Sequence, residues 1–136
     1  MRCKLIHTVG RFTQPEMHDA QSEGVNVKAV YIASPYTIGD VAKNVRRQVD
    51  TATILIDCGM APFWPLNSHF LHMFWPKSYE TWVKLDEAWV KKCDALYRLE
   101  GESNGADREV LIAKENGIPV FYNLNDLYEW SKQDAD

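Results

Sequence analysis

From Lys28 onward, short apolar runs alternate with segments of helical periodicity, and this alternation restricts the possible folds more than any other feature of the chain. Strand-like runs rich in β-branched and aromatic residues occur at 29–33, 95–99 and 118–123, with a further short apolar segment at 60–65. The spacing of apolar residues predicts helices at 41–59, 78–94, 106–116 and 124–133. Such alternation is typical of a parallel sheet covered by helices on both faces. The sequence therefore predicts an α/β protein with a sheet of four to five strands.

The beginning of the chain differs from the rest. Residues 1–27 are polar, contain Pro15 and Gly24 and show no sustained periodicity, so we expect an arm or a loose first element there. Within this stretch, 4–9 could add a strand at a sheet edge. The remainder, 28–136, has a length that fits one domain with a sizeable core.

Composition argues against several classes of protein. The chain has 15 Lys and Arg against 19 Asp and Glu, and its net charge of −4 does not favour general nucleic-acid binding. No apolar run approaches the roughly 20 residues that cross a bilayer, so no membrane association is expected. The three cysteines are far apart and lack CxxC spacing, which favours a reducing, cytoplasmic location over a disulfide framework.

The fingerprints of common cofactor sites are missing from the sequence. Neither GxGxxG nor GxxxxGK[ST] occurs. His69 and His72 could in principle bind a metal with Cys58, but HxxH without a third ligand at motif spacing is a poor signal. We therefore expect neither a cofactor nor a metal.

One acidic residue, Glu109, falls on the apolar side of its predicted helix and not on the solvent side. Each residue of a helix advances by about 100°, which places Glu109 inside the apolar arc of its helix, formed by Ala106, Val110, Ile112 and Ala113. The neighbouring charged residues Asp107 and Arg108 fall on the solvent side. Glu109 is thus either an acid that binds backbone groups at a helix start or a catalytic group.

A second acid shows the same pattern on the preceding helix. Asp86 falls on the apolar face that contains Trp82, Leu85, Trp89, Val90 and Cys93. A buried carboxylate is costly unless it is paired, hydrogen-bonded or protonated. Both acids are expected near loops at the same end of the sheet, where ligands of such sheets bind. Two carboxylates in one site suit reactions at the anomeric carbon of a sugar.

Two loops should open into the same crevice. The turn at 101–105 leads into the Glu109 helix, so that Ser103 and the backbone of Gly105 could hold an anion at the helix N-terminus. A serine at this place is usually just a helix cap. The loop after the first strand brings Ser34 and Tyr36, although it could equally be an ordinary strand-to-helix turn.

Aromatic residues are concentrated between Phe63 and Trp82. Seven of these twenty residues are aromatic, in what the sequence suggests is a loop. We expect most of them in the core or in a contact between subunits, and some in a wall on which a base stacks. The protein is therefore expected to be a homo-oligomer.

Four stretches together resemble the nucleoside 2-deoxyribosyltransferase superfamily, whose members exchange bases on deoxynucleosides or hydrolyse nucleoside 5′-monophosphates. They are VYIASPYT (30–37), GMAPFWP (59–65), LDEAWVKKCDALYRL (85–99) and GESNGADREVLIAKENGIPVF (101–121). The most specific part is S-x-G-x-x-x-E at 103–109. The first loop departs from the glycine-rich form of the better-known hydrolases, so its contacts with a phosphate are less well supported.

The resemblance implies a flavodoxin-like fold and a role for each matching residue. Glu109 would be the nucleophile that attacks C1′, and Asp86 would lie near the sugar. Ser103 and Gly105 would bind the 5′-phosphate. Apart from the resemblance, we expect Tyr31, Ser34 and Tyr36 to contribute to the substrate pocket because of their place near the crevice. The expected activity is cleavage of the N-glycosidic bond of a (deoxy)nucleoside 5′-monophosphate, with base exchange by a deoxyribosyltransferase or non-catalytic nucleotide sensing as alternatives.

Overall fold

Four parallel strands form one sheet in residues 26–133, the part of the chain that the structure, a computed structural model, describes. The spatial order of the strands is β2-β1-β3-β4, so β1 and β3 lie in the middle. Their bounds are Ala29–Ala33 for β1, Ala61–Phe63 for β2, Ala95–Arg98 for β3 and Val120–Phe121 for β4. From β1 the chain first adds β2 on one side and then adds β3 and β4 on the other side. This change of side creates a crevice beyond the carboxyl ends of β1 and β3.

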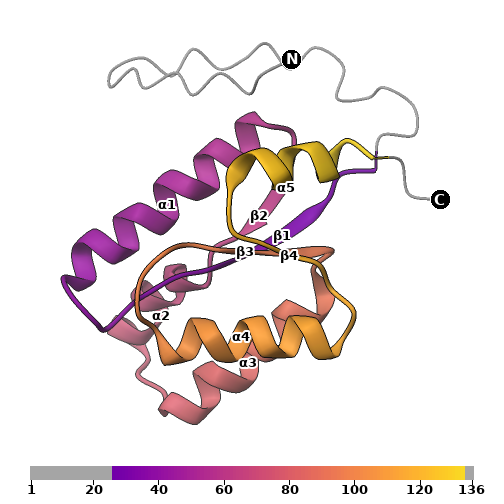
Figure 1. The fold of residues 1–136 in the computed structure, drawn as a ribbon. Coiled ribbons are helices and arrows are strands. Elements are labelled where there is room, and N and C mark those ends of the chain that lie inside the picture. Colours follow the sequence, from indigo (N-terminus) through magenta and orange to yellow (C-terminus); the bar gives the residue numbers. More distant parts are fainter. Residues whose placement is uncertain (1–25, 134–136) are drawn as a thin grey trace, which may run out of the picture.

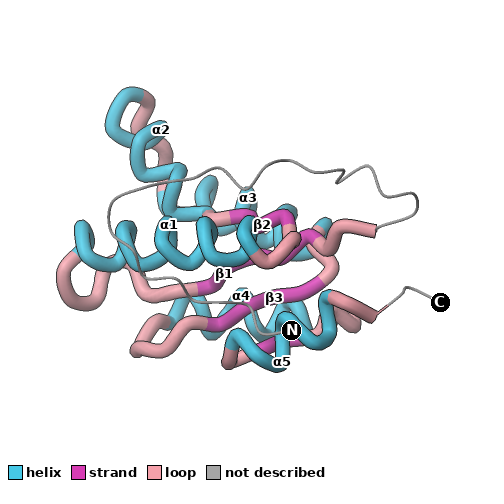
Figure 2. Tube along the Cα trace, turned by 90° about the horizontal axis from the view of Figure 1, so that it is seen from above, coloured by secondary structure: helices cyan, strands magenta, loops and turns pink. Residues whose placement is uncertain are grey.

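Helices cover both faces of this sheet (Figure 1). On one side lie α1 and α5, and on the other lie α3 and α4, whereas α2 projects away from the layers in the view of Figure 2. The bounds are Val41–Asp57 for α1, Ser68–Phe74 for α2, Tyr79–Lys92 for α3, Asn104–Glu115 for α4 and Leu124–Ser131 for α5. A short 3-10 helix, η1 (Pro65–Asn67), connects β2 to α2.

The central strand β1 divides the core into two layers. Side chains alternate along a strand, so Val30 and Ile32 pack in the cluster with residues of α1 and α5, while Tyr31 and Ala33 pack with residues of α3 and α4. All four side chains are fully buried. Burial of one large apolar side chain contributes about 1.5–3 kcal/mol, and this two-sided burial fixes β1 between the two helical layers.

Polar side chains define where the helices begin. Asp40, Ser78, Ser103 and Asn123 each accept a hydrogen bond from the backbone N–H three residues later. Each such cap stabilises a helix start by about 1 kcal/mol. Because Ser103 begins α4, the same turn that could hold an anion also sets the direction of the helix that carries Glu109.

The loops after β1 and β3 pack against each other. Leu99 N donates to Ala33 O over 2.9 Å, which extends the pairing of the two strands. Gly101 has a φ of 123°, and a Cβ at this position would lie 2.7 Å from Pro35 Cγ. Only glycine therefore suits this close approach. The contact brings the first loop and the loop that leads into α4 to one end of the sheet.

The predicted fold class is confirmed, and each helix and strand predicted from residue 28 onward occurs within a few residues of its expected position. The apolar segment 60–65 contains the edge strand β2. The segment expected as an aromatic loop instead contains η1 and α2, and α2 has no buried residue. The edge strand predicted at 4–9 and residues 1–25 of the arm predicted at 1–27 lie outside the described residues. Within 26–133, no helix is long and apolar enough to span a membrane.

The buried face of α3 is narrower than its apolar pattern predicts. Val90 and Cys93 are buried, but Leu85 and Trp89 remain 41% and 40% exposed. Trp89 stacks on Phe63 with ring centroids 4.5 Å apart, and Phe63 belongs to the short edge strand β2. Because the sheet ends at β2, part of the apolar face of α3 extends past the edge of the sheet and remains exposed.

Candidate active site

A pocket of about 490 Å³ lies beyond the carboxyl ends of β1 and β3. Its walls come from the loop after β1, the connection through η1 and α2, the first half of α3 and the first turns of α4. Six of the seven predicted site residues line it, namely Ser34, Tyr36, Asp86, Ser103, Gly105 and Glu109. Residues that are far apart in sequence thus meet at the place where ligands bind in this type of sheet.

Glu109 points into the pocket from α4 and is partly buried. The pKa of its carboxyl is raised from 4.5 to about 8, first by burial and then by the negative charge of Asp86. The hydroxyl of Tyr31 and the positive charge of Arg98 act in the opposite direction. The orientation predicted from the helical spacing is confirmed, because Ala106, Ile112 and Ala113 of the same helix are buried.

Asp86 reaches the same pocket from α3. Burial raises the pKa of its carboxyl from 3.8 to about 7. Its neighbour Glu87 also lines the pocket but forms an ion pair with Arg108, with a distance of 2.6 Å between Arg108 Nη2 and Glu87 Oε1. Asp86 forms no ion pair with a described residue, and burial alone accounts for its raised pKa.

Tyr31 lies beneath the pocket and not on its wall. Its side chain is fully buried and stacks on Phe63 with ring centroids 5.6 Å apart. Burial and the negative charges of Glu109 and Asp86 raise the pKa of its hydroxyl. This hydroxyl makes no hydrogen bond of standard geometry to a described residue, yet it is close enough to the Glu109 carboxyl to lower that pKa. Tyr31 is therefore placed to act on Glu109 and not on a bound base.

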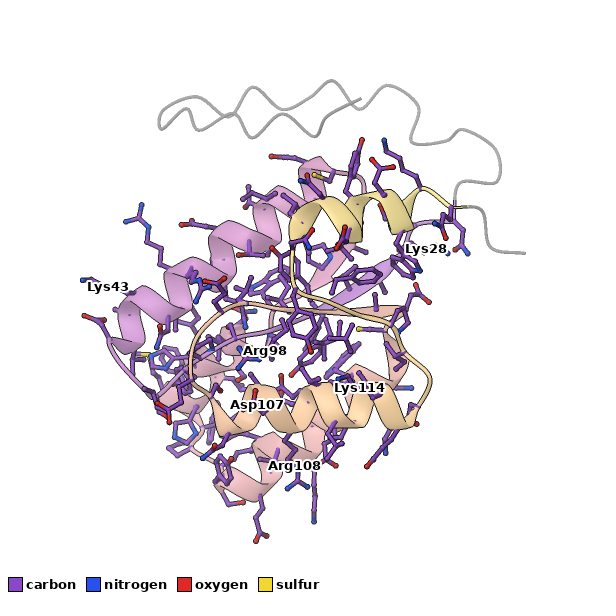
Figure 3. The ribbon with its side chains drawn as sticks, viewed as in Figure 1. Lys28, Lys43, Arg98, Asp107, Arg108 and Lys114 are labelled. Atoms are coloured by element: carbon purple, nitrogen blue, oxygen red, sulfur yellow. The ribbon has the colours of Figure 1, made fainter. Side chains whose placement is uncertain are left out.

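Arg98, which the sequence did not suggest, organises the loop between β3 and α4. Its buried guanidinium donates to the backbone oxygens of Leu99 and Gly101 and, over 2.9 Å, to Asp107 Oδ1. Figure 3 shows Arg98 directed toward Asp107 at the start of α4. These bonds satisfy a buried charge and hold the turn in which Ser103 and Gly105 lie. The only sequence signal was an arginine at the end of a buried strand.

Tyr36 connects the first loop to α2. Its hydroxyl lies 2.5 Å from Nδ1 of His69, and both residues line the pocket. Asn44 of α1 supports the same loop by donating to the backbone oxygens of Tyr36 and Ile38. Because α2 buries no residue, the hydrogen bond between Tyr36 and His69 is what connects the wall contributed by α2 to the first loop.

His72 connects α2 to α3 and is not arranged as a metal ligand. Its Nδ1 accepts from Trp82 Nε1 over 2.9 Å and from the backbone N of Lys77 over 3.3 Å. An indole nitrogen only donates, so this ring nitrogen carries no proton. Within residues 26–133, no group of three His, Cys, Asp or Glu side chains could hold a metal ion.

The aromatic segment divides between the core, the pocket and the surface. Phe63 stacks between Tyr31 and Trp89, and Trp82 and Tyr79 line the pocket. Three more aromatic residues are largely exposed, namely Phe70, Phe74 and Trp75. Apolar side chains beside them on α2, Leu71 and Met73, are exposed as well.

The basic side chains of the pocket complete its electrostatics. Lys77 and Arg108 line it together with the N-terminus of α4, which carries a partial positive charge, and the charge of Arg108 is paired with that of Glu87. The pocket therefore combines two acids of raised pKa with groups that favour an anion. Such a combination suits a substrate that has both a reactive carbon and a negatively charged group.

Comparison with known proteins gives the chain a family. Residues 28–123 match a family described as a domain of unknown function, DUF7768. The chain belongs to the DUF7768 family. No curated protein sequence matches it.

The fold of this DUF7768 domain is similar to that of a solved enzyme. The structure, described as a 2-deoxyribosyltransferase from the psychrotolerant bacterium Bacillus psychrosaccharolyticus, is 20% identical in sequence, with a TM-score of 0.53. The similarity covers 76% of this chain and 81% of the other chain. The family resemblance seen in the sequence is thereby confirmed at the level of the fold.

Proposed function

We propose that this protein cleaves the N-glycosidic bond of a (deoxy)nucleoside 5′-monophosphate and releases the free base. The observation that carries the proposal is the meeting of Glu109 and Asp86 in one pocket, each with a strongly raised pKa. Acids perturbed by burial and by each other are typical of catalytic sites. The fold shared with a 2-deoxyribosyltransferase supports chemistry at the anomeric carbon.

The pair of acids would divide the work by sharing a proton. With pKa values of about 7 and about 8, the pair retains about one proton near neutral pH. Because Asp86 has the lower pKa, the shared proton resides mainly on Glu109, and the reactive form, with Glu109 ionised and Asp86 protonated, is the less populated one. The Tyr31 hydroxyl and the charge of Arg98 favour this reactive form, in which Asp86 would hold the proton.

The reaction would then proceed in two displacements. The Glu109 carboxylate attacks C1′, the C–N bond breaks with its electron pair moving to the base, and Asp86 donates its proton to the departing base. Water next attacks C1′ of the glycosyl intermediate, gives its proton to Asp86 and frees the Glu109 carboxylate. The products are the free base and the sugar 5-phosphate, and both acids regain their starting forms.

The start of α4 would bind the phosphate. Ser103 and Gly105 line the pocket at this helix N-terminus, where backbone N–H groups and the helix dipole attract an anion. Lys77 adds positive charge to the same pocket, whereas the charge of Arg108 is paired with that of Glu87. Of the first loop, Ser34 and Tyr36 would also contact the nucleotide, and Tyr31 would support Glu109 from below.

Transfer of the sugar to a second base is the alternative activity. The observation in its favour is that the solved protein of the same fold is described as a 2-deoxyribosyltransferase. In a transferase the acceptor base would replace water in the second step. A nucleotide sensor without turnover is the remaining alternative, and it predicts binding that does not depend on the Glu109 charge.

We further propose that the protein is a homo-oligomer. Phe74 and Trp75 are 75% and 70% exposed at the end of α2, and contiguous exposed apolar surface often marks a contact with another protein. The expected cytoplasmic location stays a prediction, which fractionation of the source cells would test.

Incubation with a substrate panel tests the activity directly. The purified protein would be mixed with nucleosides and with ribo- and deoxyribonucleoside 5′-monophosphates, with and without an acceptor base, and free base would be measured by chromatography. We expect base release from 5′-monophosphates without an acceptor. Exchange only in the presence of an acceptor would establish the transferase, and binding without any release would establish the sensor.

A further inference from the structure

Gln48 on α1 is a fully buried polar residue that connects several parts of the pocket. Its Oε1 accepts a hydrogen bond from the backbone N of Leu66 over 2.8 Å. Its Nε2 donates to the backbone O of Ile32 over 3.1 Å and to Ser34 Oγ over 2.8 Å. The side chain thus joins α1 to the end of β1 and to the η1 segment.

Two of these partners fix the orientation of the Gln48 amide. A backbone N–H can only donate, so Leu66 must face the amide oxygen. A backbone carbonyl can only accept, so Ile32 must face the amide nitrogen. The second hydrogen of that nitrogen is then directed to Ser34 Oγ, which must accept it.

This arrangement decides what the Ser34 hydroxyl can do. A serine hydroxyl has one hydrogen to donate and two lone pairs that accept. Because Gln48 occupies the acceptor side, the Ser34 hydrogen is left for another group. Among residues 26–133 the hydroxyl donates to no other residue, although Ser34 is only 8% exposed and lines the pocket. A buried donor of this kind normally has an acceptor, and here the open side is the pocket.

The position of Ser34 indicates which part of a ligand it would meet. Residues on either side of it pack against the loop that leads into α4, through the bond from Leu99 N to Ala33 O and through the contact of Gly101 with Pro35. Ser34 and the N-terminus of α4 therefore border the same pocket from adjoining loops. An oxygen anion bound at that helix start is the acceptor that suits a hydroxyl donor.

We propose that Gln48 is a positioning residue, which keeps Ser34 Oγ as an acceptor so that the Ser34 hydroxyl donates to an oxygen of the substrate's 5′-phosphate. The inference rests on the proposed function in taking a nucleoside 5′-monophosphate as the ligand. It adds a residue that touches no substrate itself and acts only through Ser34.

A double-mutant cycle tests this role. Gln48→Met, Ser34→Ala and the double variant would be prepared in a Glu109→Gln background, so that ligand is bound without turnover. Calorimetry would measure binding of the four deoxynucleoside 5′-monophosphates and of the matching deoxynucleosides. We expect each single variant to weaken binding of the monophosphate about tenfold, the double variant to be no weaker than Ser34→Ala, and the deoxynucleosides to be affected less than about threefold.

Asn44 supplies the matched control. Its side-chain amide also reaches from α1 to the first loop, but it donates to Tyr36 O and Ile38 O and does not contact Ser34. Asn44→Leu should therefore add its effect to that of Ser34→Ala. Gln48→Glu is a second probe if Gln48→Met does not fold, since a carboxylate can keep the contact with Leu66 N but cannot donate to Ser34.

The outcomes separate this inference from the proposed function. Additive effects of Gln48→Met and Ser34→Ala, an equal loss for nucleosides, or no nucleotide binding at all would overturn it. If the effects in the cycle are not additive but the wild-type protein releases no base from any substrate, the positioning role stands and the proposed activity is overturned instead.

Discussion

Asp86 on α3 lies close enough to Glu109 on α4 for its negative charge to raise the pKa of the Glu109 carboxyl. The two helices pack side by side on one face of the sheet (Figure 1). Each presents its acid to the same pocket. Two carboxyls in this position cannot easily both be ionised. The pair is therefore best treated as one group that loses two protons in succession.

Activity should depend on pH as a narrow bell. The form that carries one proton is the active one, because Glu109 must be ionised and Asp86 protonated. The limiting pKa values of about 7 and about 8 place the maximum of kcat/KM between them, with losses on both sides. A pH profile with a saturable substrate would measure this. A plateau that extends down to pH values near those of ordinary carboxyls would contradict the shared proton.

Neutralising Glu109 should stabilise the protein at alkaline pH. A carboxyl with a pKa that is higher in the folded than in the unfolded state contributes stability at low pH, and that contribution is lost as the pH rises through the folded pKa. For Glu109 the loss falls between about 4.5 and about 8. Glu109→Gln should therefore raise the free energy of unfolding above pH 8 by roughly 2 kcal/mol, less than the whole shift implies because the pocket is open to water.

Urea denaturation at two pH values would measure this effect. The gain of Glu109→Gln should be clear above pH 8 and nearly absent at a pH close to the ordinary value of 4.5. Glu115→Gln is the control, because Glu115 is exposed on the same helix and does not line the pocket. Equal stability of wild type and Glu109→Gln at both pH values would show that Glu109 is not desolvated.

Removing the Tyr31 hydroxyl should change the chemistry and leave the fold intact. The ring of Tyr31→Phe can keep its place against Phe63, and the lost hydroxyl has no partner of standard geometry among the described residues. Glu109 would lose a neighbour that favours its ionised form. Because the pKa of Glu109 is the higher of the two, we expect the alkaline limb of the pH profile to move up by about one pH unit and kcat to fall about tenfold.

Tyr97→Phe is the matched control for that experiment. Tyr97 lies on the neighbouring strand β3 but packs in the cluster with residues of α1 and α5. Its replacement should leave the alkaline limb in place. An alkaline limb that is the same in Tyr31→Phe as in the wild type would remove Tyr31 from the site.

The exposed aromatic residues of α2 should control assembly. Sedimentation of the wild type is expected to show an oligomer, which Phe74→Ser and Trp75→Ser should weaken because each removes a large exposed apolar side chain. Leu111→Ser on α4 is the control, since Leu111 is 56% exposed but lies on another helix. A monomeric wild type, or equal loss from all three changes, would contradict a contact through α2.

The sequence predicted the framework because local patterns and burial agree there. The run 29–33 is strand-like, and its last four residues are buried. In the helix that carries Glu109, the buried residues Ala106, Ile112 and Ala113 belong to the predicted apolar arc. The direction of Glu109 therefore follows from helical spacing alone, and its meeting with Asp86 follows from the place of both acids near the carboxyl ends of the strands.

The residues that the sequence did not reveal depend on contacts between distant segments. Gln48 is buried in a helix where Val49, an apolar residue, is 42% exposed. Its burial is compensated by bonds to β1 and η1, whose positions no local pattern contains. The burial of the Arg98 charge is likewise compensated by its hydrogen bond to Gly101 O in the loop that follows. For α2 the pattern of apolar residues was misleading, because this helix buries none of them.

The most direct test compares base release by the wild type, Glu109→Gln and Glu115→Gln from nucleoside 5′-monophosphates. We expect release by the wild type and by Glu115→Gln, and a loss of at least about a thousandfold in Glu109→Gln, whose thermal denaturation should show that it is folded. Wild-type release that persists in Glu109→Gln would contradict a glutamate nucleophile. An absence of release from every substrate by the wild type would contradict the proposed activity itself.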